Sequence, residues 1–157
     1  MTAVAAEPRP LRTLEAQHAD RVWAALAPLM AARPTMRLWA REGGFHKRAA
    51  LTQRRPDEPA AVMLFRRHRT RTLVFDLDAK TAGGAEAVTA DHARLTFWLS
   101  GYGARFISDR STSGGVHVIV PLARAIAITQ VAPFMRAAAA LYPTLDIKPM
   151  MNPQQGC

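Results

Sequence analysis

Between residues 72 and 147, short apolar runs alternate with segments of helical spacing, and this order constrains the fold more than any other feature. Apolar residues recur at helical spacing over 85–100 and 130–141, which predicts two helices. Four apolar runs have the length and composition of strands: 72–75, 104–108, 116–120 and 145–147. The resulting order of strand, helix, strand, strand, helix, strand is typical of an α+β sheet that carries its helices on one face.

The first half of the chain is less regular. Apolar residues at helical spacing predict a helix from Leu14 to about Met30, with Thr13 as half of a capping signal and Pro34 beyond its end. The apolar run 61–65 predicts a short strand.

A basic run follows at 66–71, and we expect it to form an exposed loop before the strand at 72–75. These patterns divide the chain into a flexible lead-in (1–12), an N-terminal module (13–70) and a core (71–157). The ending at 152–157 resembles a loop, so we expect the chain to be shortened or to lack downstream parts.

The charge is strongly positive and consists mainly of arginine. Lys and Arg number 21 against 12 acids, a net charge of +9, and 18 of the 21 are Arg. A guanidinium group suits phosphate oxygens, so the excess is compatible with a nucleic-acid partner. A GC-rich coding sequence would equally produce much Arg and Ala, and charge alone therefore leaves both explanations open.

Several classes of protein are disfavoured. No apolar run approaches the roughly 20 residues of a membrane span, and Glu7, Pro8 and Arg9 interrupt the apolar start that a signal peptide needs. The single cysteine, Cys157, cannot form a disulfide framework or a cysteine zinc site within one chain. We expect a cytoplasmic protein with no membrane partner.

Two acidic residues end the apolar run at 72–75. Residues two apart in a strand point to the same side, so Asp76 and Asp78 should present both carboxylates together. Two close like charges repel unless a cation lies between them, and hard oxygen ligands suit Mg²⁺ or Mn²⁺. A strand end that turns into a solvated polar loop is the alternative. The buried approach through Val74 and Phe75 favours a metal.

A second motif runs from a small-residue loop into a strand. Hydroxyl and glycine residues at 111–115 would let backbone N–H groups approach phosphate oxygens. His117 alternates with valines, so it could face the same side as the acidic pair. On its own this motif is better explained as an ordinary hairpin loop. A third acid, Asp146, lies between two aliphatic residues, and alone it is best explained as a surface-facing strand residue. In combination it could close a metal site with Asp76 and Asp78.

Together the three motifs resemble the archaeo-eukaryotic primase superfamily, in particular the primase-polymerase domains of replication proteins from plasmids and other mobile elements. The first family motif, two acids one residue apart, corresponds to Asp76 and Asp78. The second, Ser-x-His, corresponds to the segment ending at His117, and the third, a hydrophobic residue followed by Asp, to Asp146. Gly115 stands where the family has Ser, so the hydroxyl would come from a neighbouring serine.

The resemblance implies an RRM-like sheet with a smaller N-terminal α/β module, and template-directed nucleotidyl transfer with Mg²⁺ or Mn²⁺. Asp76, Asp78 and Asp146 would hold the metal ions, with His117 as a further catalytic residue. The nucleoside triphosphate would be bound by residues of the second motif: Ser111, Ser113, Gly114, Gly115 and His117. Arg110 and Lys148 match no family motif, but their positions suggest that they add positive charge there. The backbone of a single-stranded or primed DNA template would contact the basic run: Arg66, Arg67, Arg69 and Arg71. A helicase domain or protein is a further possible partner.

Two alternatives stay open. The first is a DNA-binding replication initiator that keeps the fold without catalysis. The second is a phosphatase of the haloacid-dehalogenase type, since 74–78 resembles the opening motif of that family. Lys80 stands where that family has Thr or Val, and the later acidic pair is missing. The basic run 66–71 is equally well explained as a solvated loop.

Overall fold

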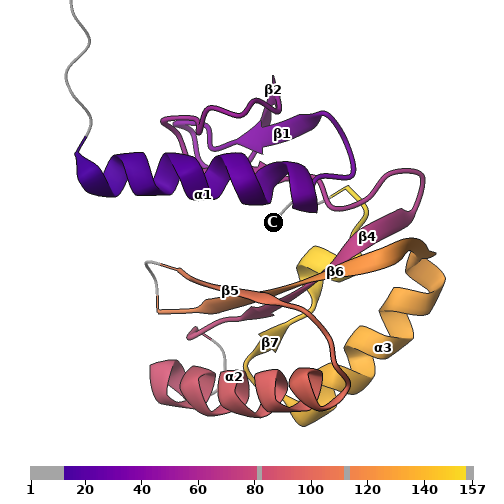
Figure 1. Ribbon diagram of the computed structural model, residues 1–157. Helices are drawn as coiled ribbons and strands as arrows, with labels where there is room; N and C mark the ends of the chain where they lie inside the picture. Colours follow the sequence, from indigo (N-terminus) through magenta and orange to yellow (C-terminus); the bar gives the residue numbers. More distant parts are fainter. Residues whose placement is uncertain (1–12, 81–82, 112–113, 155–157) are drawn as a thin grey trace, which may run out of the picture.

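Two antiparallel sheets and four helices form an α+β fold (Figure 1). The computed structural model describes residues 13–80, 83–111 and 114–154, so the predicted lead-in 1–12 lies outside it. No helix in these ranges is long and apolar enough to cross a membrane. In chain order the elements are α1 (Leu14–Met30), β1 (Thr35–Leu38), β2 (Lys47–Ala50), β3 (Ala60–Val62), β4 (Arg69–Leu77), α2 (Gly84–Gly101), β5 (Ile107–Arg110), β6 (Val116–Ala127), α3 (Ile128–Leu141), β7 (Leu145–Asp146) and α4 (Lys148–Met151).

The larger sheet has the predicted succession of elements. Its strands lie in the order β5-β6-β4-β7, and each neighbouring pair is antiparallel. With α2 between β4 and β5, and α3 between β6 and β7, this is the split βαββαβ arrangement of RRM-like domains. Figure 1 shows α2 and α3 side by side on one face of this sheet, which confirms the predicted α+β class with helices on one face.

The core lies between that face and the two helices. Phe75 and Leu77 of β4 are at most 1% exposed, and they pack with Leu95 of α2 and Met135 of α3. The ring of Phe75 meets that of Phe134 edge-on, with centroids 6.1 Å apart. Because side chains alternate along a strand, the residue between the two buried ones, Asp76, points to the opposite face of the sheet.

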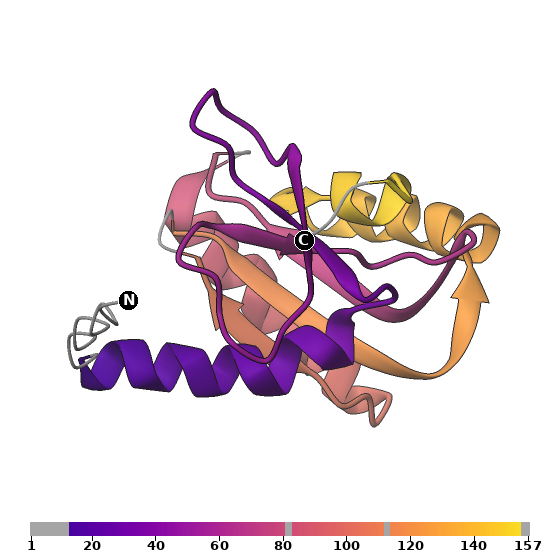
Figure 2. The ribbon, with the colours of Figure 1, turned by 90° about the horizontal axis from the view of Figure 1, so that it is seen from above.

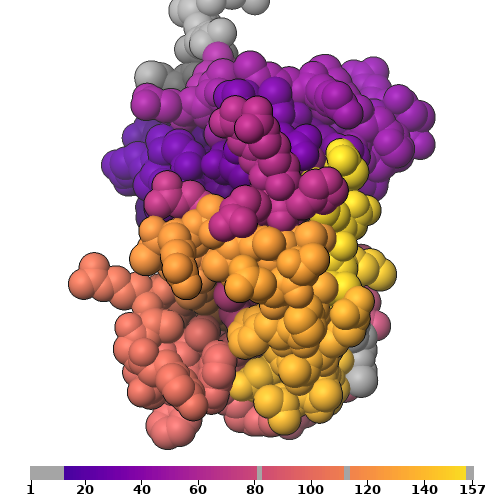
Figure 3. All heavy atoms as spheres, turned by 90° about the vertical axis from the view of Figure 1, so that its right-hand side faces the viewer, coloured from indigo at the N-terminus to yellow at the C-terminus, as the bar shows by residue number. Residues whose placement is uncertain are grey.

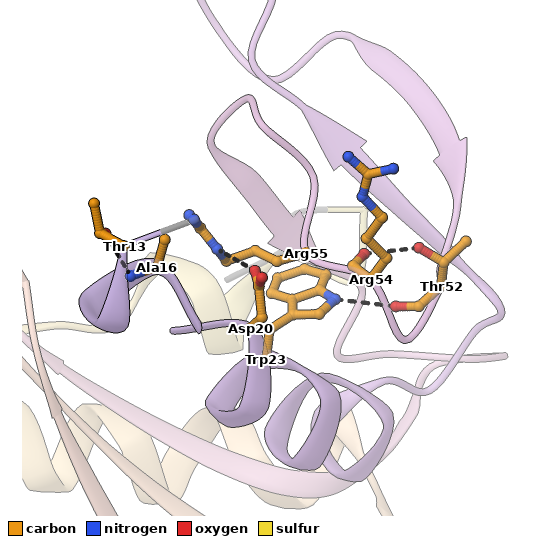
Figure 4. A network of polar contacts seen from close by, with 7 residues as sticks. All are labelled: Thr13, Ala16, Asp20, Trp23, Thr52, Arg54 and Arg55. Carbon is orange, nitrogen blue, oxygen red and sulfur yellow. Dashed lines mark hydrogen bonds and ion pairs between the residues drawn. The ribbon is translucent and has the colours of Figure 1, made fainter. Parts of the chain in front are cut away.

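The N-terminal module covers that opposite face (Figures 1 and 2). Its three strands lie in the order β2-β1-β3, and α1 lies with this small sheet on the same side of the larger sheet. Figure 4 shows how the segment after β2 attaches to α1: the Trp23 indole N–H donates to the Thr52 carbonyl oxygen over 3.0 Å, and Arg55 Nε lies 3.3 Å from Asp20 Oδ1. The helix begins as predicted, with Thr13 Oγ1 accepting from the Ala16 N–H.

Several predicted boundaries were wrong, and the strand expected at 116–120 is the longer β6, Val116–Ala127. The strand expected at 61–65 is β3, Ala60–Val62, and the strand expected at 104–108 is β5, Ile107–Arg110. The basic run 66–71 is a loop only at its start, because β4 already begins at Arg69. β4 thus starts two residues before the predicted division of the chain at 70/71. The strands β1 and β2 and the short α4 were not predicted at all.

A tight turn explains the error at the basic run. Arg67 and His68 both have positive φ, 49° and 59°, as the two central residues of a type I′ hairpin turn require. Arg66 and Arg69 on either side exchange backbone hydrogen bonds of 2.9 and 3.0 Å. The turn is therefore only two residues long, and the second half of the basic run, from Arg69 on, belongs to β4.

One buried carboxylate connects α2 to the sheet. Asp91, only 4% exposed, accepts two hydrogen bonds at Oδ2, from the Thr144 N–H at 3.0 Å and from Thr144 Oγ1 at 2.9 Å. Its Oδ1 lies 3.3 Å from Arg94 Nη1. The Thr144 carbonyl oxygen in turn accepts from the Asp78 N–H at 2.9 Å. Asp91 therefore fixes the chain that leads into β7.

Replacing Asp91 with Ala should lower the free energy of unfolding by about 2–4 kcal/mol, because two buried donors of Thr144 lose a charged acceptor. Urea unfolding followed by circular dichroism would measure this. The exposed Glu86 on the same helix provides the control, and Glu86→Ala should change the free energy by less than about 0.5 kcal/mol. Equal effects of the two substitutions would show that Asp91 has no such anchoring role.

Candidate active site on the face of the larger sheet toward α1

The strand register aligns four titratable residues across the sheet. Asp76 of β4 is the cross-strand partner of His117 on β6 and of Asp146 on β7, and His117 is also the partner of Asp109 on β5. Directly opposed residues in antiparallel strands point to the same face. Asp109, His117, Asp76 and Asp146 therefore form one row, on the face that lies toward α1. We call these four residues the cross-strand row.

His117 lies between two carboxylates of the row. Its Nε2 is 3.4 Å from Asp76 Oδ1, and its Nδ1 is 4.0 Å from Asp109 Oδ2. The hydrogen bond to Asp76 raises the pKa of His117 above its usual value of 6.5, and the charges of Asp76, Asp109 and Asp78 act in the same direction. Partial burial opposes this rise in the pKa. The site therefore favours the cationic imidazolium, which can donate from both ring nitrogens.

The other two predicted acids, Asp78 and Asp146, each accept a hydrogen bond from the backbone N–H two residues later. Asp78 Oδ1 accepts from the Lys80 N–H, and Asp146 Oδ1 accepts from the Lys148 N–H, both at 2.9 Å. The ammonium group of Lys148 is 3.7 Å from Asp146 Oδ2. Lys148 thus lies beside the row, as the sequence suggested for a residue that adds positive charge there.

The three predicted metal ligands match a hard divalent cation in donor type and in location. Carboxylate oxygens are the ligands that Mg²⁺ and Mn²⁺ prefer, and Asp76 and Asp146 are directly opposed on one face. Within the described ranges, however, no three His, Cys, Asp or Glu side chains gather in a geometry that could hold a metal ion. Joint coordination would require the three carboxylates to turn toward a common point. The metal site stays a prediction.

The glycine-containing loop between β5 and β6 closes tightly next to the row. The Ser111 N–H donates to the Gly115 carbonyl at 2.9 Å, and the Gly114 N–H donates to the Ser111 carbonyl at 3.1 Å. Ser113 lies outside the described residues. A Cβ atom at Gly115 would be 2.8 Å from the Leu77 carbonyl oxygen of β4. The close approach of these strands gives a physical reason for glycine where the family motif has serine.

The predicted arginines divide into two groups, neither beside Asp76. Arg110 is the partner of Val116 in the register, so its side chain shares the helix-covered face and points away from His117. Arg69 begins β4, seven residues before Asp76, which places it about 24 Å away along the strand. Arg69 and Arg71 donate to carbonyl oxygens of Ala125 and Ala123. Arg66 and Arg67 are exposed at the turn.

A cleft separates α1 from β5 and β6 and opens beside His117. It has a volume of about 440 Å³. Trp23, Leu26 and Met30 of α1 line one wall, and Asp109, His117 and Ile119 of the sheet line the other. A ligand in this cleft would meet apolar side chains of α1 on one side and Asp109 and His117 of the row on the other.

Sequence reasoning missed Asp109 and the α1 wall. Asp109 was placed beyond the end of a strand predicted at 104–108, whereas the real strand runs from Ile107 to Arg110. Asp109 is followed directly by the basic Arg110, and this sequence gave no indication of a partner on β6. Correct placement of the strand would have revealed the contact, because Asp109 and His117 flank a short loop.

Comparisons with known proteins place few limits on function. Neither the protein-family models nor the curated proteins contain a match to the sequence. Among solved structures, the fold is similar to the polymerase domain from Mycobacterium tuberculosis Ligase D in complex with DNA, with a TM-score of 0.48 and 14% identity. The similarity covers 78% of this chain and 61% of that chain. A similarity of this size assigns neither a family nor an activity.

The pKa of His117 should produce a measurable pH dependence. A raised pKa means that protonation stabilises the folded state fully below the unfolded value of 6.5, and that this contribution disappears as the pH rises through the folded value. The difference in unfolding free energy between the wild type and His117→Gln should therefore shrink as the pH rises through that window. A histidine NMR titration of the metal-free protein should give a midpoint above 6.5; a midpoint at or below 6.5 would contradict the contact with Asp76.

Gly115→Ala should destabilise the fold by about 1–3 kcal/mol, because its Cβ would overlap a backbone oxygen that cannot move independently. Gly101→Ala provides a matched control, since a Cβ there meets nothing within 4 Å. That control should be neutral or stabilising by up to about 1 kcal/mol. Thermal or urea denaturation would distinguish the two; a neutral Gly115→Ala would remove the close approach of β4 and β6 as an explanation for this glycine.

Proposed function

We propose that the chain catalyses template-directed nucleotidyl transfer as a DNA primase or polymerase. The substrates would be nucleoside triphosphates and a single-stranded or primed DNA template, and the setting would be replication of a plasmid, phage or integrated element. The single observation that carries the proposal is the position of Asp76, opposed on one sheet face by His117 and by Asp146. The motif order in the sequence and the net charge of +9 support it.

Each group in the row has a task in such a reaction. Asp76, Asp78 and Asp146 would hold Mg²⁺ or Mn²⁺, which supplies positive charge that activates the primer 3′-hydroxyl and offsets the charge of the triphosphate. His117, cationic through its contact with Asp76, would donate to a phosphate oxygen. Lys148, beside Asp146, would add a further positive charge. Asp109 would hold the His117 ring from the other side.

The template would contact a different part of the same sheet. The exposed turn residues Arg66 and Arg67 lie at the far end of β4 from Asp76, about 24 Å or more along the strand. A strand of DNA that reaches both places would have to pass around α1, because Thr72 and Val74 on the same face of β4 are buried and Thr72 Oγ1 donates to the Leu29 carbonyl of α1. Their contribution to affinity should be electrostatic and should decrease as the salt concentration rises.

A DNA-binding protein without catalysis is the second candidate, and one observation favours it. The carboxylates of Asp78 and Asp146 are engaged by backbone N–H groups, and that of Asp76 by His117, so they do not converge on one point. In that case the row would have no catalytic role. The two candidates differ in whether nucleotides are incorporated.

Incorporation of labelled nucleotides on primed and unprimed single-stranded templates, with Mg²⁺ or Mn²⁺, tests the proposal. Asp76→Asn and Asp146→Asn should each lower the rate at least about 100-fold, because a neutral amide is a poor ligand for a hard cation. Both variants should bind the template within about two-fold of the wild type. The exposed acid Glu42, in the N-terminal module, provides the control: Glu42→Gln should retain full activity.

Other outcomes would reject nucleotidyl transfer. A folded wild type that binds DNA without incorporating any nucleotide would support the non-catalytic initiator. Phosphate release from small phosphoesters that depends on Asp76 would support the phosphatase. Activity that survives both substitutions, with circular dichroism unchanged, would remove the row from the catalytic machinery.

A further inference from the structure

The outer surface of α2 and α3 exposes an unusual concentration of large apolar side chains. Nine large hydrophobic residues are exposed among the described residues, and five of them lie at the C-terminal end of α2 or on α3. Phe97 is 83% exposed and Leu141 60%. The five are Phe97, Trp98, Tyr102, Phe134 and Leu141. Clustered exposed apolar residues of this kind mark interaction sites more often than scattered ones do.

A groove runs between the two helices at this place. It has a volume of about 220 Å³ and ends on Phe75 of β4. Trp98 forms one wall, and Phe134 and Leu141 form the other, with the small side chains of Ala137 and Ala138 leaving the space between them. Figure 3 shows the side of the molecule on which the end of α2 and α3 lie next to each other. The groove is large enough for one bulky side chain from a partner.

The surroundings of the groove are cationic. From Asp91 to Leu145 the sequence has two acids against five arginines. Asp91 is buried and lies 3.3 Å from Arg94, and Asp109 lies on the other face of the sheet. Arg94 is at the edge of the groove, where it donates to the Leu141 carbonyl and stacks over the Tyr142 ring at 5.4 Å. Glu86, the nearest acid on the exposed side of α2, is twelve residues before Trp98, about 18 Å along the helix.

We propose that this groove binds an acidic peptide segment that inserts one large apolar side chain between Trp98 and Leu141. The apolar walls would take up the side chain, and the surrounding guanidinium groups would attract the flanking carboxylates. The site is on the opposite face of the sheet from the cross-strand row, and it does not rest on the proposed nucleotidyl transfer. It would connect this chain to an acidic partner protein.

Charge and shape favour a peptide over two other occupants. A second copy of this chain would bring its own arginine-rich surface and a net charge of +9, so like charges would oppose the contact. Single-stranded nucleic acid binds by stacking bases on free ring faces. Here the Trp98 ring already packs against both Tyr102 at 5.3 Å and Phe134 at 6.4 Å. Ala137, Ala138 and Leu141 add aliphatic walls, which accept a side chain rather than a base.

Fluorescence anisotropy with three labelled hexapeptides tests the proposal on the full chain. Asp-Asp-Glu-Leu-Phe-Asp should bind with a dissociation constant below about 500 μM. Lys-Lys-Arg-Leu-Phe-Lys, which reverses the charge, and Asp-Asp-Glu-Ser-Ser-Asp, which lacks the apolar anchor, should each bind at least about ten-fold more weakly. In NMR spectra, the acidic peptide should shift the indole N–H signal of Trp98 and leave that of Trp39, in the other module, unchanged.

Two tryptophan substitutions on α3 localise the binding. Ala137→Trp fills the groove and should weaken the acidic peptide at least about ten-fold. Ala140→Trp, at an exposed position of the same helix outside the groove, should leave the affinity within about two-fold. Ala137→Glu gives a second test that repels the acidic flanks. Circular dichroism and thermal denaturation would establish that each variant folds.

Several results would overturn the proposal. These are no preference for the acidic anchored peptide over the other two, equal effects of Ala137→Trp and Ala140→Trp, or a shift at Trp39 as large as that at Trp98. Tighter binding of an oligothymidylate than of the acidic peptide, lost in Ala137→Trp, would assign the groove to nucleic acid. None of these results bears on nucleotide incorporation, so the two proposals can fail separately.

Discussion

The register of β4 between β6 and β7 is the constraint on which the rest of the structure depends. A slip of one residue would turn Phe75 and Leu77 out of the core and bury Asp76 among the side chains of α2 and α3. The burial of these two residues makes such a slip costly. The close approach of Gly115 to the Leu77 carbonyl and the hydrogen bonds of Asp91 to Thr144 hold the neighbouring strands in place. The register that forms the core therefore also forms the row.

The row concentrates negative charge that the protein only partly neutralises. Asp76 and Asp146 are directly opposed, and like charges in that position destabilise a sheet. His117 and Lys148 provide the nearby positive groups, and the raised pKa of His117 is the electrostatic consequence. A bound divalent cation would relieve the same repulsion. This charge imbalance lowers the stability of the fold. We therefore propose that the row is kept for a function.

The sequence allowed the core to be predicted more fully than the site. The alternation around Asp76 and the helical spacing of α2 and α3 reflect burial, a local and repeated signal, so the elements of the larger sheet were found in the correct order. β2, Lys47–Ala50, is short and largely exposed, so it lacks such a pattern. The alternation of His117 with valines predicted that its side chain faces the same side of the sheet as Asp76. The contact of Asp109 with His117 and the position of α1 over the row depend on long-range packing, which has no period in the sequence.

Paramagnetic broadening of the histidine NMR signals by Mn²⁺ tests most directly whether the row is a metal-dependent centre. Substoichiometric Mn²⁺ should broaden the imidazole signals of His117 first. His92, which bonds Ser108 on the helix-covered face, and His68, at the far turn of β4, should stay sharp. Asp76→Asn combined with Asp146→Asn should abolish the effect. Equal broadening of His117, His92 and His68, or broadening that persists in the double variant, would contradict a metal site at the row.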